Sequence, residues 1–412
     1  MNIKEKVTER MMRYAKVHTT SDPESAVYPT AMRQKTLAEM LVQELNAIGA
    51  NDVYLDESAI VVYAKIPANS SKADVPSVGF IAHLDTSPEA SGENVRPWIL
   101  KRYDGGDIVL NEAKNIVMRA ADFPDLARYR GQELILTDGT TLLGADDKAG
   151  IAEIMTLAEY LLAHPELPHG TVCLAFTPDE EVGGLARDLD LARFGADFAY
   201  TVDCDHLGTY AYETFNASQA HITVHGVSVH TGTAKGKMKN AADIAAAFQA
   251  ALPAAEKPQY TAGREGFFCV LSCRASIERA ELEILIRDFD KDGFAAREAL
   301  LFSIADELNS RYGDGTVTVT VTPQYRNMGD IIREHTELID RLTAAIKESG
   351  VTPVCEPFRG GTDGAALSFR GLPCPNLSSG YENAHGRFEF IPVPSMVKTV
   401  EILVNLCTGF AG

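Results

Sequence analysis

The sequence predicts an α/β protein in which helices flank a mixed, largely parallel central sheet, with a second, smaller α+β domain inserted into the chain. Three observations support this prediction. Short apolar runs typical of buried strands alternate with stretches of helical periodicity, which is the pattern of a layered α/β domain. The pattern changes to a compact α+β one from about residue 215 and returns near residue 328. The 412 residues also exceed what one hydrophobic core usually serves, so two domains are expected.

Residues 1–214 are expected to begin the larger domain. In the segment 30–48, Leu37, Leu41 and Leu45 share one face of a helix, which Gly49 is suited to end. The run 76–84 is apolar on both faces, which is typical of a central parallel strand covered on both sides. The other elements expected here are strands at 59–66, 171–177 and 197–203 and a helix at about 148–163.

Residues 215–327 are expected to form the smaller domain, and residues 328–412 to complete the larger one. The elements expected in the smaller domain are strands at 219–225, 281–287 and 315–322 and helices at 239–253 and 293–310. The chain then returns to the buried α/β pattern in a helix at 330–348 and in the segments 372–377 and 396–409.

The composition narrows the classes of partner. A formal net charge of −19 argues against nucleic acid or an anionic membrane as a partner, because both would repel the protein. Several of the carboxylates could instead hold cations. No run approaches the length of a membrane span, and the charged N-terminus lacks the apolar stretch of a signal peptide. The seven cysteines form no Cys-x-x-Cys pair, which disfavours zinc ribbons and disulfide frameworks. A cytoplasmic location is expected.

Candidate chemical groups follow the predicted buried strands, at the strand ends where α/β domains place their sites. His83 and Asp85 come at the end of the 76–84 run. In an extended chain their side chains face the same way, so Asp85 can orient the imidazole of a metal-bound His83. The alternative is a chance His-x-Asp in a turn, and so short a motif does not by itself separate the two.

Asp146 and Asp147 lie between glycines at the start of the 148–163 helix. Adjacent aspartates at a helix start can be a cap and a first-turn acid, both of which stabilise a helix. That interpretation suits one of the two. For the pair, we favour a carboxylate that bridges two cations roughly 3.5–4 Å apart.

Further carboxylates and a second histidine complete the set. Glu180 and Glu181 directly follow the strand at 171–177. Paired glutamates on a surface loop are usually solvated charge, but after a buried strand one can bind a metal while the other takes a proton from metal-bound water. Asp203 ends the next buried strand, where an unpaired charge is costly. His385 lies in a glycine-flanked loop near the C-terminus.

This mixed nitrogen and oxygen set suits zinc, with cobalt or manganese as alternatives. The sequence has no Gly-x-Gly-x-x-Gly segment and no phosphate loop, so nucleotide chemistry is unsupported. It has no Gly-x-Ser-x-Gly elbow either, which disfavours a serine hydrolase. Metal-assisted hydrolysis is the chemistry that remains.

Eight segments, in collinear order, resemble the peptidase T family of tripeptide aminopeptidases, a branch of the co-catalytic zinc superfamily of aminoacylases, glutamate carboxypeptidase and dipeptidases. The similarity covers essentially the whole chain. The HLD segment is generic to the superfamily, whereas TLLGADDKAG together with FRGGTDG is specific to this branch. The segments are HLDTSP (83–88), TLLGADDKAG (141–150), AFTPDEEVG (175–183), YTVD (200–203), VHTGTAKG (229–236), IRDFD (286–290), FRGGTDGAALSF (358–369) and GLPCPNLSSG (371–380).

The resemblance implies a zinc-peptidase catalytic domain that holds two Zn²⁺ per subunit, for which Co²⁺ or Mn²⁺ could substitute. His83 and Asp203 would bind one zinc ion. Glu181 and His385 would bind the other, and Asp146 would bridge the two.

The resemblance also assigns the catalytic carboxylates. Glu180 corresponds to the general base on the bridging water, and Asp85 to the carboxylate that orients His83. The peptide bond after the bridging aspartate is expected to be cis. The chain departs from the family pattern at Asp205 and His206, which are both potential ligands beside Asp203.

By the same resemblance, the smaller domain would be a lid or dimerisation domain. His230 would reach from it to stabilise the oxyanion, although a lone histidine in a β-rich segment is otherwise more often structural. Asn240, Arg287 and Arg359 would contact the substrate backbone or its C-terminal carboxylate, because the planar fork of arginine suits a carboxylate. Each arginine could equally form a surface ion pair.

The function implied is hydrolysis of the N-terminal peptide bond of short peptides, chiefly tripeptides, by a zinc-bridged hydroxide. Two alternatives stay open. One is another reaction of the superfamily, as a dipeptidase, carboxypeptidase or N-acyl-amino-acid deacylase. The other is a non-catalytic peptide-binding relative that has lost its metals. A homodimer is compatible with the resemblance, although some relatives close the site within one chain.

Overall fold

The computed structural model describes residues 1–412, and the contacts within it divide the chain into two units. The first unit comprises Met1–Tyr212, Met328–Glu356 and Thr362–Gly412. The second comprises Glu213–Asn327 and Pro357–Gly361, so it also takes a short segment from the part of the chain assigned above to the larger domain. That each unit folds as a domain of its own stays a prediction.

A mixed eight-stranded sheet forms the centre of the first unit. Its strands are β1 (Asn51–Asp56), β2 (Val61–Ile66), β3 (Val78–His83), β8 (Val172–Thr177), β9 (Phe198–Cys204), β10 (Thr209–Ala211), β15 (Val354–Cys355) and β16 (Asn376–Ser378). They lie in the order β1-β2-β8-β3-β9-β16-β10-β15, and β8, β3, β9 and β16 are parallel neighbours. β3 is buried along its whole length between two parallel strands, which explains its unbroken apolar run.

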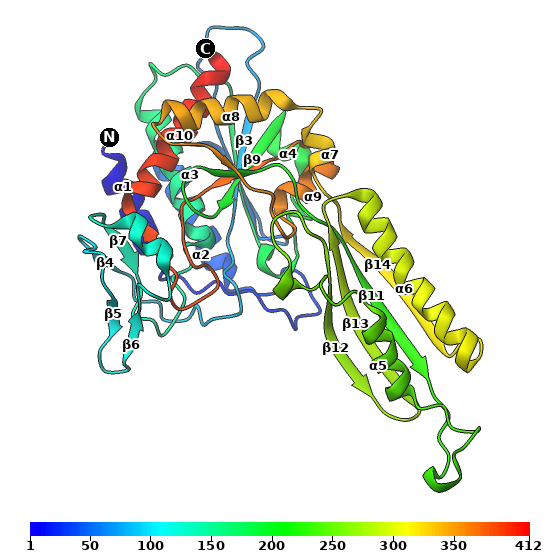
Figure 1. Ribbon diagram of the computed structural model, residues 1–412. Coiled ribbons are helices and arrows are strands. Elements are labelled where there is room, and N and C mark those ends of the chain that lie inside the picture. The colour runs from blue at the N-terminus through cyan, green and yellow to red at the C-terminus, as the bar shows by residue number, and fades with distance from the viewer. The chain divides into compact units, whose positions relative to one another are not determined.

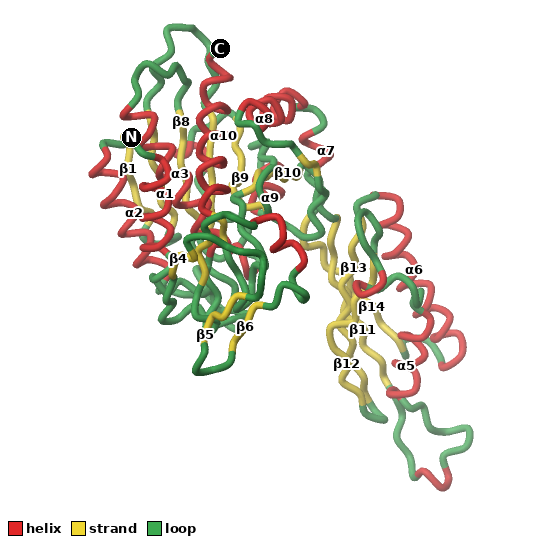
Figure 2. Tube along the Cα trace, turned by 60° about the vertical axis from the view of Figure 1, so that its left-hand side comes forward, coloured by secondary structure: helices red, strands yellow, loops and turns green.

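Helices cover both faces of this sheet. The larger layer consists of α1 (Ile3–Tyr14), α2 (Gln34–Ile48), α3 (Ala145–Ala163), α8 (Thr336–Glu348) and α10 (Val393–Ala411). α1, α3 and α10 contact one another in this layer (Figure 2). α3 is buried on nearly all sides, because it packs against the strands as well as these two helices. The short helices α4 (Leu191–Phe194) and α9 (Asp363–Phe369) contribute to the second apolar cluster, on the opposite face.

A small β subdomain follows β3 in the chain, in a stretch for which no strand or helix was predicted. Its elements are β4 (Trp98–Leu100), β5 (Ile108–Asn111), β6 (Ile116–Met118), the 3₁₀ helix η1 (Pro124–Tyr129), β7 (Leu134–Leu136) and the distant β17 (Ile391–Pro392). Strand β17 pairs with β7, so backbone hydrogen bonds join the C-terminal part of the chain to this subdomain. Its core, which we call the aromatic cluster, contains Tyr103, Leu126, Tyr129, Phe390 and their apolar neighbours.

The second unit is a four-stranded antiparallel sheet with helices packed on one face (Figure 1). Its strands lie in the order β12-β13-β11-β14, and α5 and α6 contact β13 from the same side. The elements are β11 (Asn216–His225), the 3₁₀ helices η3 (Thr231–Thr233) and η4 (Pro258–Tyr260), α5 (Ala241–Ala251), β12 (Phe267–Ala275), β13 (Arg279–Asp288), α6 (Lys291–Tyr312) and β14 (Val317–Tyr325). Alternate residues of β13 point into one apolar core.

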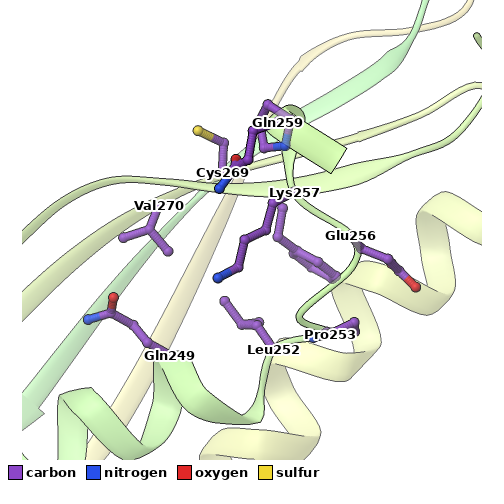
Figure 3. A pocket seen from close by; sticks show the side chains of 10 residues that line it. Gln249, Leu252, Pro253, Glu256, Lys257, Gln259, Cys269 and Val270 are labelled. Carbon is purple, nitrogen blue, oxygen red and sulfur yellow. The ribbon is translucent and has the colours of Figure 1, made fainter. Parts of the chain in front are cut away.

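A cavity of about 240 Å³ lies between the end of α5 and strand β12 (Figure 3). Leu252, Pro253 and Phe268 give it apolar walls, and Lys257 and Gln249 bring polar groups to it. It contains none of the side chains that the sequence predicted for a functional site.

The predicted fold class is confirmed. Gly49 ends α2 with a left-handed φ of 87°, as expected of a C-cap glycine. The single helix expected at 330–348 is instead two, α7 (Gly329–Ile332) and α8, because His335 leaves the helical region with φ −129° and ψ 51°. Helix α1 and strands β1 and β12 were not predicted. No helix combines the length and apolar character needed to cross a membrane.

Candidate metal centre

Five segments converge at one edge of the central sheet. Strands β8, β3 and β9 are parallel neighbours, so their carboxyl ends lie together and bring His83, the Glu180–Glu181 pair and Asp203 to the same edge. Asp146 enters from the start of α3, and His385 from the loop before β17. Residues separated by up to about 300 positions in sequence therefore meet in one cluster.

Asp146 lies at the centre of this cluster and faces both histidines. Its Oδ1 is 3.0 Å from Nε2 of His83, and its Oδ2 is 3.1 Å from Nε2 of His385. The Asp146–Asp147 peptide bond is cis, as the resemblance implied. Asp146 and Asp147 have non-helical backbone angles, so helical geometry begins only after them. The carboxylate thus offers one oxygen to each of two imidazoles.

The possible metal-binding atoms form two overlapping groups that share His83. Donor atoms of His83, Glu180 and Asp203 lie within 4.8 Å of one another, and so do those of His83, Asp146 and Glu181. Nε2 of His83 is 3.6 Å from Oδ1 of Asp203. Nε2 of His385 is 2.9 Å from Oε2 of Glu181. Each group has the size and donor types of a metal-binding site.

Asp85 supports the cluster from behind. Nδ1 of His83 is 3.1 Å from the backbone oxygen of Asp85 and 3.3 Å from its Oδ1. The same buried carboxylate accepts the backbone N–H groups of Glu180 at 3.0 Å and Glu181 at 3.3 Å. Asp85 therefore orients the imidazole ring and also holds the turn that carries the two glutamates.

The carboxylates of the cluster are buried and crowded together. Burial, with repulsion from Asp146, raises the pKa of Asp203 and of Glu181 to about 7 each. Burial and the neighbouring Asp203 raise the pKa of Glu180 well above its usual range. Oε1 of Glu181 is buried without a hydrogen-bond partner. So many carboxylates packed beside two imidazoles fit divalent cations, and a mixed nitrogen and oxygen set suits zinc.

Sequence reasoning missed Glu389. This side chain is 1% exposed and accepts three backbone N–H bonds from the turn that precedes Asp147. Its position within the apolar run FEFIPV was the available signal, because a charge in a buried run needs partners. Asp205 and His206, the open alternatives beside Asp203, belong to neither group of donors.

The four residues predicted to contact substrate all lie in the second unit. Arg287 is buried and donates to the backbone oxygens of Ser218 and Ile286 at 3.1 and 3.0 Å. Arg359 donates to the backbone oxygens of Gly263 and Glu265 at 2.7 and 3.0 Å.

The other two are caps at the starts of helices. Asn240 caps α5 by accepting the N–H of Ala242 at 3.1 Å. His230 is exposed and caps η3, where its Nδ1 accepts the N–H of Gly232 at 3.2 Å. None of these contacts tests a role in binding substrate, which stays a prediction for all four.

The mixed sheet and the histidine and carboxylate cluster at its edge define the class of protein as an α/β protein with a candidate site for divalent metal ions. Residues 212–316 match a family model described as a peptidase dimerisation domain. Peptidase T of Geobacillus thermodenitrificans is 51% identical over 408 residues, which cover 99% of each chain. Peptidase T of Halothermothrix orenii is 50% identical over 406 residues, or 98% of this chain and 99% of that protein. The chain belongs to the peptidase T family.

Solved structures share the fold. An aminopeptidase from Bacillus cereus superposes with a TM-score of 0.76 at 23% identity, over 99% of both chains. A tripeptidase from Staphylococcus aureus also has a TM-score of 0.76, at 21% identity over 99% of this chain and 98% of that one. A dinuclear metal-binding peptidase from Bacillus subtilis has a TM-score of 0.68 at 14% identity, over 98% of each.

Proposed function

We propose that this protein is a metal-dependent aminopeptidase that releases the N-terminal residue of tripeptides. The observation that carries the proposal is the Asp146 carboxylate, which offers one oxygen to His83 and the other to His385 within a cluster that includes Glu180. Full-length similarity to proteins named Peptidase T supports the substrate class, as does the shared fold with a tripeptidase and an aminopeptidase.

Two zinc ions are the proposed cofactor, with cobalt or manganese as substitutes. His83 and Asp203 would hold one ion, Glu181 and His385 the other, and Asp146 both. When bound, such ions polarise a carbonyl and lower the pKa of bound water toward neutrality. Two features favour this assignment: the mutual repulsion of the buried carboxylates, and the Oε1 atom of Glu181, which has no hydrogen-bond partner.

Glu180 is the proposed proton-transfer group. Its carboxylate belongs to the donor group around His83, and burial favours its protonated form, so it can take a proton from water and hold it for the leaving amine. Asp85 fixes Glu180 and His83 relative to each other, because its carboxylate accepts the backbone N–H of Glu180 and faces the ring of His83.

The second unit is proposed to recognise the rest of the substrate. His230 would stabilise the oxyanion, and Asn240, Arg287 and Arg359 would contact the peptide backbone or its C-terminal carboxylate. The family model for a peptidase dimerisation domain supports a homodimer, which light scattering of the purified protein would reveal as twice the chain mass. A cytoplasmic location completes the proposal.

Product analysis tests this function. Zinc-loaded protein is incubated with an unblocked tripeptide, the same tripeptide acetylated at its N-terminus, and a dipeptide. Release of the N-terminal residue from the free tripeptide alone is the expected result. Cleavage of the acetylated tripeptide or of the dipeptide would point to a deacylase, carboxypeptidase or dipeptidase with the same metal site. Binding of peptide without any cleavage would favour a non-catalytic relative.

A further inference from the structure

Glu389 joins two loops that are far apart in sequence. Its Oε2 accepts the N–H groups of Leu143 at 2.8 Å and Gly144 at 2.7 Å, and its Oε1 accepts the N–H of Asp146 at 2.9 Å. All three donors belong to the turn that ends at the cis peptide bond. Because both oxygens of this one side chain accept, three amides of the turn are held by a single group.

The other loop carries His385, four residues before Glu389. Backbone bonds between Glu382 and Phe390, at 2.9 and 3.1 Å, close this loop at its base, and the N–H of Glu389 donates to the oxygen of Gly386 at 3.2 Å. Backbone hydrogen bonds therefore close the loop that carries His385. Because Glu389 belongs to this loop and also binds the turn that carries Asp146, one side chain connects the backbones that present Asp146 and His385.

The contacts of the buried Lys148 place it next to the same turn. Its ammonium donates to the backbone oxygen of Val17 at 2.7 Å, and a Cβ built on Gly144 would lie 3.5 Å from its Nζ. The carboxylate of Glu389, which is 1% exposed, is therefore buried near the Lys148 side chain and together with its three amide donors. Such an environment suits a side chain that keeps the backbone of the turn in one conformation.

We propose that Glu389 is a positioning residue for the metal centre, which holds Asp146 where its two oxygens can face His83 and His385 at once. The proposal rests on the metal centre described under the proposed function. The three hydrogen bonds that the Glu389 side chain accepts all come from the backbone of residues 143–146, so it would act on Asp146 through that backbone.

Zinc affinity of the Glu389→Gln variant tests the proposal. A glutamine has one acceptor oxygen and a donor amide, so it cannot satisfy all three N–H groups. Loss of a residue that orients metal ligands typically weakens metal binding about 10–100-fold, and that is the expected result in competition with a chromophoric chelator. The visible spectrum of the cobalt-loaded variant should also change shape, because the ligand geometry changes. Saturating zinc should restore most of the activity.

Glu153→Gln is the matched control, because Glu153 is also a fully buried carboxylate on α3 but accepts no hydrogen bond from the turn. Its zinc affinity and cobalt spectrum should match wild type. If Glu389→Gln fails to fold, Glu389→Asp keeps the charge but withdraws it by one methylene, and it should weaken zinc binding in the same direction.

Two outcomes would overturn the inference. One is a folded Glu389→Gln or Glu389→Asp variant with the zinc affinity and cobalt spectrum of wild type. The other is a variant whose only defect is a lower unfolding temperature of the metal-free protein, which would make Glu389 a structural residue. Wild-type protein that binds no zinc would instead refute the proposed metal centre, so the two failures are distinguishable.

Discussion

Burial and the neighbouring Asp203 raise the pKa of the Glu180 carboxyl well above its usual range, which suits a group that takes up a proton. It also lies close enough to His83 and Asp203 to act as a ligand. Replacement by glutamine keeps the shape and removes the titrating group. We expect Glu180→Gln to lower kcat about 10²–10⁴-fold while zinc content stays near that of wild type. Metal analysis of the purified variant decides between the roles, because a loss of zinc together with activity would identify Glu180 as a ligand.

Glu153 gives the first unit a specific pH dependence. Burial alone raises its pKa well above the ordinary 4.5, and neither of its oxygens has a hydrogen-bond partner. The folded protein therefore keeps this proton after the unfolded chain has released it. Ionisation favours the unfolded state, so the free energy of unfolding that Glu153 contributes falls as pH rises above its ordinary pKa.

Glu153→Gln removes this titration. We expect the stability of the variant relative to wild type to increase from about pH 5 to about pH 8, because only wild type pays the ionisation cost. Chemical denaturation of metal-free protein at several pH values measures the difference. A difference that stays constant with pH would show that Glu153 ionises freely in the folded protein.

At the scale of elements, the β subdomain has a role that its position in the sequence did not suggest. Phe390 and Phe388, which follow His385, pack on Tyr129 and Phe123 with ring centroids 5.5 and 5.1 Å apart. Tyr129 also donates a hydrogen bond to Glu382 at the base of the same loop. The aromatic cluster thus anchors the loop that presents His385.

Phe390→Ala should therefore cost about 3–5 kcal/mol of stability, because it leaves a cavity at a residue that is 1% exposed. The protein has a single tryptophan, Trp98, which packs against this cluster, so its fluorescence during denaturation reports the region directly. Phe369→Ala is the control, since that ring is 42% exposed and should cost far less. Equal losses in both variants would contradict the anchoring role.

At the scale of the whole molecule, the metal centre concentrates negative charge in a chain whose net charge is already −19. Ligands from β3, β9, α3, the turn after β8 and the loop before β17 would be tied together by bound ions. Binding to the folded state alone stabilises a protein by about 2.7 kcal/mol per site at a free concentration of 100 Kd.

Removal of metal should accordingly lower the unfolding temperature, as measured by calorimetry before and after chelation. Added zinc should restore the temperature, whereas magnesium should not, because two imidazoles in the donor set favour zinc over a cation that prefers oxygen. An unfolding temperature that chelation leaves unchanged would argue that these ligands are not joined by ions.

The alternation of buried strands and helices could be predicted from the sequence, because hydrophobic periodicity is a property of residues close together in the chain. For the same reason β3, with its full apolar run, could be placed at the sheet centre, and His83, Asp146 and Glu181 could be recognised beside glycines and strand ends. Strand β12 was missed, because it lies at a sheet edge and its exposed Leu271 and Arg274 obscure the alternation.

Contacts between distant segments, by contrast, depend on the tertiary structure. Glu389 meets the amides of residues 143–146, and Tyr129 meets Glu382, across more than 240 positions of the chain. No local pattern encodes such a pair, because its free energy depends on both segments being brought together by the packing of the core. Local sequence patterns predict a set of candidate ligands and the strands that carry them. The fold decided which backbone holds each ligand in place, since that requires the whole first unit to assemble.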